Sequence, residues 1–117
     1  MATLLIIVSS PPYAGSDAAW NALRLAETGL EAGNSVRLFL INEGVDAGRA
    51  AIARPEGSFD LCAMLKGLAG KGAEIKYCKT CIDRCGVGTG EMASHVVMGS
   101  MKELHRWVMT SDRVVTF

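Results

Sequence analysis

The apolar positions of this chain fall in short runs that are separated by turn-forming residues. Leu4 to Val8 is a continuous apolar run ending at Ser-Ser-Pro-Pro, a pattern typical of a strand buried on both faces of a parallel sheet. Strands are also predicted at 35–41, 73–77 and 112–117, each bounded by glycine-bearing or polar turns. The apolar residues of 94–98 are too few for their spacing to distinguish a strand from a helix.

Apolar residues recur at helical spacing in segments between these strands. Most of these segments begin near a residue that can accept a hydrogen bond from the first helical turn. The predicted helices are one from Ser16 or Asp17 to Gly33-Asn34, a short weak one at 44–53, one capped by Ser58 from Phe59 to about Ala69, and one capped by Ser100 that contains Met101, Leu104, Trp107 and Val108.

The alternation of strands and helices predicts a single domain over residues 1–117. We expect a three-layer α/β fold with a mostly parallel five-stranded sheet, helices on both faces and a flavodoxin-like strand order. Ligands of such folds bind beyond the carboxyl ends of the strands, where the chain changes direction between the first and third strands. This places the loop Ser9 to Ser16 beside Cys78.

Composition narrows the classes of partner. Lys and Arg number 12, as do Asp and Glu, and neither sign forms a long block, which argues against nucleic acid or an anionic membrane surface. Apolar residues make up 50% of the chain against 21% charged, so we expect more apolar surface than one core buries, and hence a homo-oligomer.

The first residues, Met1 to Val8, lack a basic segment, and their apolar run is too short for a signal peptide or a membrane span. We therefore expect a cytoplasmic protein. In a reducing compartment, closely spaced cysteines are more often catalytic or metal-binding than joined in structural disulfides.

Three of the four cysteines lie within the run 77–86. Cys78 is predicted at the end of a strand, where backbone N–H groups and the cations of Lys79 or Arg84 stabilise a thiolate, the nucleophilic form of the side chain. The alternative is that Cys78 is a small buried apolar residue. Clustering at a strand end favours the chemical role.

The other cysteines have weaker assignments. Cys81 either attacks a persulfide or mixed disulfide on Cys78 or packs against the sheet. Cys85 lies four residues further along, on the same face if the segment is helical, and a structural role is favoured for it. Cys62 lies among apolar residues of a predicted helix, so it is expected in the core and serves as an internal control.

A metal site is the main chemical alternative. Cys78, Cys81 and Cys85 offer three thiolates, and His95 is a conceivable fourth ligand for zinc or an iron–sulfur cluster. The chain has no second Cys-x2-Cys or paired histidines, so no metal and no cofactor are predicted. His105 is expected to be a solvated helix residue.

Two further segments are candidates to support the cysteines. Gly86 to Gly90 has neither the ending of a Walker loop nor the spacing of a dinucleotide fingerprint, so we expect a flexible loop over Cys78 that Gly86 and Gly88 allow to open. Ser9 to Tyr13 is predicted to be a rigid turn that can aim Tyr13 at the sulfur site.

Three segments carry a family resemblance. They are the first strand with Ser-Pro-Pro-Tyr and the helix after it, the run 33–40 leading to 43–45, and Ile75-Lys76-Tyr77-Cys78-Lys79-Thr80-Cys81. In these segments, which cover nearly the whole chain, it resembles the DsrE/DsrF/TusD-like sulfur-relay family, which also contains the YchN-like proteins. The resemblance implies a flavodoxin-type subunit that assembles into trimers, hexamers or mixed oligomers and carries sulfur as a persulfide on Cys78.

In the relay systems of that family the persulfide passes to a small partner protein with a mobile C-terminal cysteine, in sulfur oxidation or tRNA thiolation. The resemblance thus implies a sulfurtransferase-like carrier whose partners are sulfur donor and acceptor proteins. The chain departs from the family pattern at Cys85, which interrupts the expected Arg-Gly pair and offers a thiol for an internal disulfide.

Two functional hypotheses follow. In the first, Cys78 takes sulfane sulfur from a donor persulfide and hands it to an acceptor thiol, with Cys81 modulating release. In the second, a homo-oligomeric module binds a small anion or nucleotide in a cleft between 9–15 and 86–90, and the cysteines are redox-sensing or structural.

Overall fold

The computed structural model describes all of residues 1–117, with strands that are separated by helices and loops. The elements, in chain order, are β1 (Thr3–Val8), α1 (Ala18–Glu31), β2 (Ser35–Leu40), the 3₁₀ helix η1 (Asn42–Gly48), α2 (Leu61–Gly70), β3 (Glu74–Cys78), α3 (Lys79–Arg84), the 3₁₀ helix η2 (Thr89–Glu91), β4 (Val97–Gly99), α4 (Met101–Thr110) and β5 (Arg113–Thr116). None of these helices is both long and apolar enough to cross a membrane.

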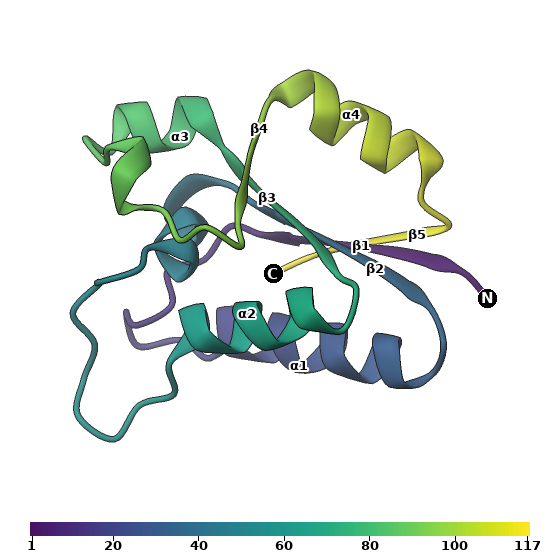
Figure 1. Cartoon of the computed structure of the whole chain (residues 1–117), viewed down its shortest axis with the longest axis horizontal. Coiled ribbons are helices and arrows are strands. Elements are labelled where there is room, and N and C mark those ends of the chain that lie inside the picture. The colour runs from purple at the N-terminus through teal and green to yellow at the C-terminus, as the bar shows by residue number, and fades with distance from the viewer.

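The sheet is wholly parallel, with the strand order β4-β3-β2-β1-β5 (Figure 1). The predicted class, a five-stranded α/β sheet with helices on both faces, is confirmed. The predicted flavodoxin-like order is wrong, since that order places β1 between β2 and β3, whereas here β1 lies between β2 and β5. The chain moves in one direction from β1 to β4, and only the connection through α4 returns across the sheet.

The two faces of the sheet are covered unequally. Right-handed crossovers in one direction place α1 and α2 on one face, and the returning α4 lies on the other, as Figure 1 shows. The first face holds a cluster of 21 buried apolar residues, whereas the cluster beneath α4 has only five. Cys78 is one of these five, so it belongs to the thinly covered face. The smaller cluster consists of Leu5, Phe39, Cys78, Leu104 and Trp107.

The connections that leave β3 and β4 lie on opposite faces of the sheet. The connection after β3 packs Ile82, Val87 and Met92 into the larger cluster, while β4 leads into α4 on the opposite face. Cys78 ends β3 and pairs with Gly99, the last residue of β4. The predicted switch between the first and third strands is therefore wrong, but the observed one also lies at Cys78, and parallel sheets bind ligands at such points.

Local hydrogen bonds decide where the helices begin. Ser100 caps α4 as predicted, accepting an N–H of the first turn at 3.3 Å. The predicted cap of α2 is wrong: the Ser58 hydroxyl donates to the carbonyl of Pro55 at 2.6 Å, and Asp60 accepts the N–H of Ala63 at 3.1 Å instead. Helix α2 consequently begins two residues later than predicted.

The remaining element predictions are resolved as follows. The weak helical stretch at 44–53 is the shorter 3₁₀ helix η1, and the undecided segment 94–98 contributes to the short strand β4 at one edge of the sheet. Asp17 precedes α1, but its side chain makes no capping hydrogen bond, and Ser16 accepts the N–H of Ala18 at 3.2 Å.

Candidate functional site

An open cavity of about 800 Å³ lies beyond the carboxyl ends of the first three strands. Residues after β1 and β2, the length of α3 and the first residue of α4 line it. They are Ser9, Asn42, Glu43, Cys78, Thr80, Cys81, Arg84, Cys85 and Met101. Three of the four cysteines of the chain therefore share one cavity.

Cys78 occupies the N-cap of α3, between the end of β3 and the first helical turn. Its Sγ accepts the N–H of Cys81 at 3.3 Å, so one of the free donors at the helix end is directed at the sulfur. The residue is 5% exposed and packs with Leu104 and Trp107 of α4. Cys78 therefore presents its sulfur to the cavity from a buried and fixed position.

Cys81 is held by the segment that follows β2. Its Sγ accepts the N–H of Asn42 at 3.2 Å, and Asn42 has a φ of 51°, in the left-handed region that Asn tolerates better than most residues. Burial raises the pKa of the Cys81 thiol, and its hydrogen bond with the Cys78 thiol raises that pKa further. The N–H of Asn42 and the charge of Arg84 act in the opposite direction. The Cys78 thiol thus contributes to the protonation equilibrium of Cys81.

Gly44 allows η1 to approach the end of β1. A Cβ atom at position 44 would lie 2.0 Å from the carbonyl oxygen of Val8. Because backbone atoms do not move aside as a flexible side chain does, a larger residue would displace η1 together with the N–H that binds Cys81. The segment from Asn42 to Gly44 therefore positions the second thiol.

The two predicted cations have different surroundings. Arg84 is exposed, lines the cavity and takes part in none of the ion pairs of the structure. Lys79 instead pairs with Asp83 one turn along α3 and does not line the cavity. The predicted support from Lys79 is therefore wrong, and Arg84 is the cation available to an anionic group near the cysteines.

The prediction that Tyr13 is aimed at the sulfur site is also wrong. Its hydroxyl donates to the carbonyl of Phe59 at 2.9 Å and accepts the N–H of Leu61 at 3.0 Å. These bonds tie the loop after β1 to the start of α2, and Tyr13 lines a different cavity. Of the predicted loop 9–16, only Ser9 lines the cavity of the cysteines.

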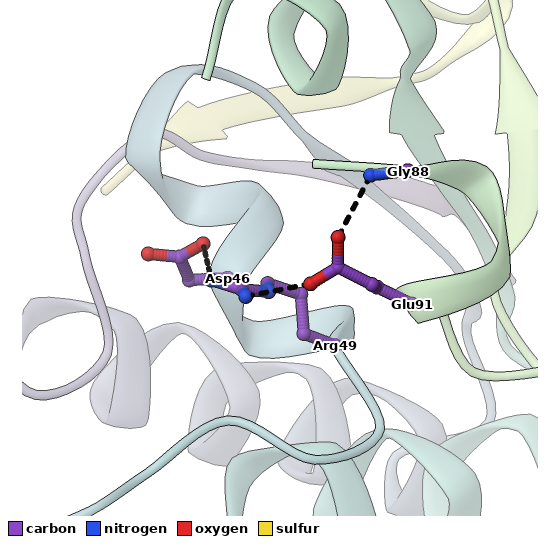
Figure 2. Close-up of polar contacts among 4 residues, drawn as sticks. All are labelled: Asp46, Arg49, Gly88 and Glu91. Carbon is purple, nitrogen blue, oxygen red and sulfur yellow. Dashed lines mark hydrogen bonds and ion pairs between the residues drawn. The ribbon is translucent and has the colours of Figure 1, made fainter. Parts of the chain in front are cut away.

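An arginine ties the glycine-rich segment to η1. Arg49 lies between Asp46 and Glu91, as Figure 2 shows. It pairs with Asp46 at 3.3 Å and with Glu91 at 2.8 Å, and Glu91 also accepts the N–H of Gly88 at 2.8 Å. The Gly88 N–H, and then Arg49, hold the pKa of Glu91 below its usual value. We call these four residues the Arg49 clamp.

The run 86–90 is therefore not the predicted lid over the sulfur site. Neither Gly86 nor Gly88 lines the cavity of the cysteines, since the Arg49 clamp holds this loop against the end of η1. The predicted cleft for an anion or nucleotide is likewise not formed, because no cavity is lined by both 9–15 and 86–90.

Cys62 lies beside His95 instead of joining the other cysteines. Its Sγ is 3.8 Å from Nε2 of His95, and that nitrogen is 3.0 Å from the carbonyl oxygen of Cys62. Burial, and then the charge of Asp60, raises the pKa of the Cys62 thiol. No group of three or more His, Cys, Asp or Glu side chains in the structure is arranged to hold a metal ion, so the alternative that combined His95 with the three clustered cysteines is wrong.

Sequence reasoning assigned no site role to Asn42, Glu43 or Met101, which all line the cavity. Asn42 and Glu43 lie just beyond the end of β2, and the rule that the carboxyl ends of parallel strands meet at one edge was a sufficient signal for them. Met101 begins α4, and no local pattern brings it to the site. Only the return of the chain across the sheet does so.

Comparison with known proteins gives consistent results. The chain matches the model of the DsrE/DsrF-like family over residues 2–117. It is 34% identical over 119 residues to Protein YchN of Escherichia coli strain K12, with both chains covered completely, and a crystal structure of ychN protein from E. coli matches with a TM-score of 0.89 over all of both chains. It is also 30% identical over 125 residues to a Pseudomonas aeruginosa protein named Sulfurtransferase TusD homolog, covering 96% of this chain and 94% of that one.

The fold itself extends to more distant sequences. A structure of a protein of unknown function, MTH1491 from Methanobacterium thermoautotrophicum, matches over the whole of both chains with a TM-score of 0.75 at 11% identity. At that identity the match shows a shared fold and nothing further.

Proposed function

The chain belongs to the DsrE/DsrF-like family, and from that premise we propose that it carries sulfane sulfur as a persulfide on Cys78. The position of one atom carries the proposal: the Cys78 Sγ lies at a strand end, accepts a helix N–H at 3.3 Å and lines an open cavity. Similarity to a protein named a sulfurtransferase TusD homolog supports the same chemistry.

The proposed exchange conserves atoms and electrons. The Cys78 thiolate attacks the terminal sulfur of a donor persulfide, a bond forms between that sulfur and Cys78, the S–S bond of the donor breaks, and the donor leaves as a thiolate that takes up a proton. An acceptor thiolate then attacks the terminal sulfur on Cys78 and releases the Cys78 thiolate. No external oxidant or reductant is consumed.

The surroundings of Cys78 suit storage of such a group. An S–S bond of about 2.05 Å places the terminal sulfur roughly that far beyond Sγ, in the cavity, while the 5% exposure of Cys78 shields the inner sulfur. Arg84, which has no ion-pair partner, is available to an acidic group on a donor or acceptor protein. Such thiol chemistry suits the cytoplasm, where thiols stay reduced.

The carrier is proposed to act as a homo-oligomer, a trimer or hexamer. Four large apolar side chains are exposed on β4 and α4: Val97 by 56%, Met98 by 47%, Met101 by 66% and Met109 by 70%. Exposed large apolar side chains of this kind favour association. Because Met101 also lines the cavity, a neighbouring subunit would lie close to the cysteines. Light scattering on the purified protein tests this, and a monomer at micromolar concentration would contradict it.

Mass spectrometry of the intact chain tests the carrier role. The reduced protein is incubated with inorganic polysulfide, freed of excess donor and measured before and after treatment with a reductant. The wild type should retain one reductant-removable sulfur atom, and Cys78→Ser should retain at least about tenfold less. Cys62→Ser is the matched control and should load like the wild type. A wild type that gains no sulfur, or a Cys78→Ser chain that loads fully, overturns the proposal.

A further inference from the structure

The three cysteines of the cavity differ in accessibility in the order of the chain. Cys78 is buried, Cys81 is partly buried and Cys85 is exposed. All three line the same cavity. A thiol on the surface of a folded donor protein can therefore reach Cys85 far more easily than it can reach Cys78.

The backbone of α3 places these thiols one after another along the helix. The N–H of Cys81 bonds to the Sγ of Cys78 at 3.3 Å, and the N–H of Cys85 bonds to the carbonyl of Cys81 at 3.1 Å. The second bond is a helical i to i+4 bond, so Cys81 and Cys85 lie on one face with Cβ atoms about 5 to 6 Å apart. Cys81 thus lies next to both of the other thiols.

We propose that Cys85 is the surface entry thiol and Cys81 the intermediate through which sulfur passes between a persulfide on a partner protein and Cys78. The proposal rests on the carrier role of Cys78 and adds the route to it. It gives Cys85, for which a structural role was favoured from the sequence, a chemical one. The route runs along α3 from the exposed to the buried end.

Each step of the route is a sulfur exchange between thiols. The Cys85 thiolate attacks the terminal sulfur of the donor persulfide, the donor S–S bond breaks, and the donor leaves as a thiolate. The Cys81 thiolate then takes that sulfur from Cys85, and the Cys78 thiolate takes it from Cys81. One S–S bond forms and one breaks at every step, and the released thiolate accepts the proton that the next attacking thiol gives up. Reversal of the steps delivers the sulfur outward.

Groups that line the cavity support the sulfur transfer from Cys85 to Cys81 and the transfer from Cys81 to Cys78. Asn42 donates its N–H to the Sγ of Cys81 at 3.2 Å, which fixes the intermediate sulfur between its neighbours. Arg84 lies in the chain beside Cys85 and lines the same cavity, so its charge faces the anions that appear as sulfur moves. The transfer requires the sulfur atoms to approach to about 3 to 3.5 Å, which side-chain rotation within one helical turn allows.

Two donors of different size test the route. Inorganic polysulfide is small enough to enter the cavity, whereas a cysteine desulfurase supplied with cysteine presents its persulfide on a protein. The rate at which sulfur appears on the Cys78 peptide is measured by alkylation, digestion and mass spectrometry. Cys85→Ser should slow loading from the desulfurase at least about tenfold more than it slows loading from polysulfide. Cys62→Ser is the control for both donors.

Four results would overturn or separate the claims. If Cys85→Ser loads from the desulfurase at the wild-type rate, or if the wild type loads from polysulfide but not from the desulfurase, the entry role fails and the carrier role stands. If neither donor loads the wild type, the carrier role itself fails. A second variant, Cys81→Ser, should accumulate a persulfide on Cys85 when charged by the desulfurase. Its absence from the Cys85 peptide would show that Cys85 serves only to shape the surface.

Discussion

Cys81 and Cys62 are two partly buried thiols on helices, and burial raises the pKa of both, yet their surroundings differ. Cys81 accepts a backbone N–H, interacts with a second thiol and lines a cavity of about 800 Å³ at the ends of three strands. Cys62 has a histidine neighbour and lines a cavity of about 350 Å³ on the side of the molecule where α2 lies. The difference shows that fixed backbone donors and a shared cavity mark the thiol site more reliably than a nearby histidine.

The hydrogen bond of His95 explains why that neighbour does not activate Cys62. Its Nε2 lies 3.0 Å from the carbonyl oxygen of Cys62. A carbonyl oxygen only accepts, so Nε2 carries the proton of this bond and is unable to take a proton from the thiol. A histidine close to a cysteine is therefore not by itself a catalytic pair.

The backbone beside the cysteine cavity should be more sensitive to substitution than any other feature of the two thiol sites. Gly44→Ala places a Cβ 2.0 Å from the carbonyl oxygen of Val8 and should lower the free energy of unfolding by about 2 to 3 kcal/mol or more. Because η1 must shift, sulfur loading of Cys78 through Cys81 should slow as well. Urea denaturation followed by circular dichroism measures the stability.

Gly67→Ala is the matched control on the helix that carries Cys62. A Cβ at position 67 has no heavy atom within 4 Å, and the residue lies inside α2, so alanine should raise the free energy of unfolding by about 0.5 to 1 kcal/mol. Equal destabilisation by Gly44→Ala and Gly67→Ala would show that the close approach of η1 to β1 is not a special feature of the site.

The pH dependence of alkylation should distinguish the two thiols by a more modest change in rate. Raised pKa values leave less thiolate at neutral pH, so alkylation of Cys81 and Cys62 by iodoacetamide should be slow at pH 7 and should keep rising at pH values above the ordinary pKa of cysteine. Cys78→Ala removes one group that raises the pKa of Cys81, so Cys81 should then react about threefold faster at pH 8. Peptide mass spectrometry measures each rate.

In the same experiment Cys62 serves as the reference thiol. Its pKa is raised by burial and by Asp60, neither of which Cys78→Ala touches, so its rate should stay unchanged. If Cys81 and Cys62 accelerate together, the variant has loosened the whole fold, and the proposed contact between the thiols of Cys78 and Cys81 receives no support.

Loss of the Arg49 clamp should change stability only slightly. The clamp joins the end of η1 to the segment that leads toward His95. Arg49→Met removes two partly exposed ion pairs and should lower Tm by about 1 to 4 °C. The clamp does not line the cysteine cavity, so loading of Cys78 from polysulfide should remain at the wild-type level. A large loss of loading would show that the clamp controls the site.

The pH dependence of that variant has a defined sign. The pKa of Glu91 is lowered in the folded state, so its contribution to stability is present above the ordinary pKa of Glu and is lost as the pH falls through the lowered value. The difference in Tm between the wild type and Arg49→Met should therefore be full near pH 7 and shrink in acid. A difference that grows on acidification would contradict the assigned pairing with Glu91.

Local sequence patterns predicted much of the fold, because each pattern indicates which side chains are buried at that point of the chain. The apolar run 4–8 and the helical spacing after residue 17 gave β1 and α1 nearly as observed. The cap of α2 was missed because Ser58 and Asp60 both suit an N-cap, and the turn at Pro55 binds the serine hydroxyl first. The three-residue strand β4 was undecided because so short a segment has no period.

Part of the cysteine site could be predicted from the sequence for a related reason. Cys78, Cys81 and Arg84 are close in sequence, so any helix following β3 brings them together at the cavity. Tyr13 and the glycine-rich run were misplaced because their partners, the backbone of residues 59–61 and Arg49, are set by packing between segments. Lys79 was misplaced for a local reason, since it pairs with Asp83 four residues along the same helix.

By itself the sequence determined the class of fold and the thiol at the end of β3, since both follow from side chains that are neighbours along the chain. Tertiary structure decided the strand order, the face on which Cys78 lies and the arrival of Met101 at the cavity of the cysteines. The physical reason is that a strand pattern records burial but not which strand lies alongside. That choice depends on the whole path of crossovers, which α4 completes on the second face of the sheet.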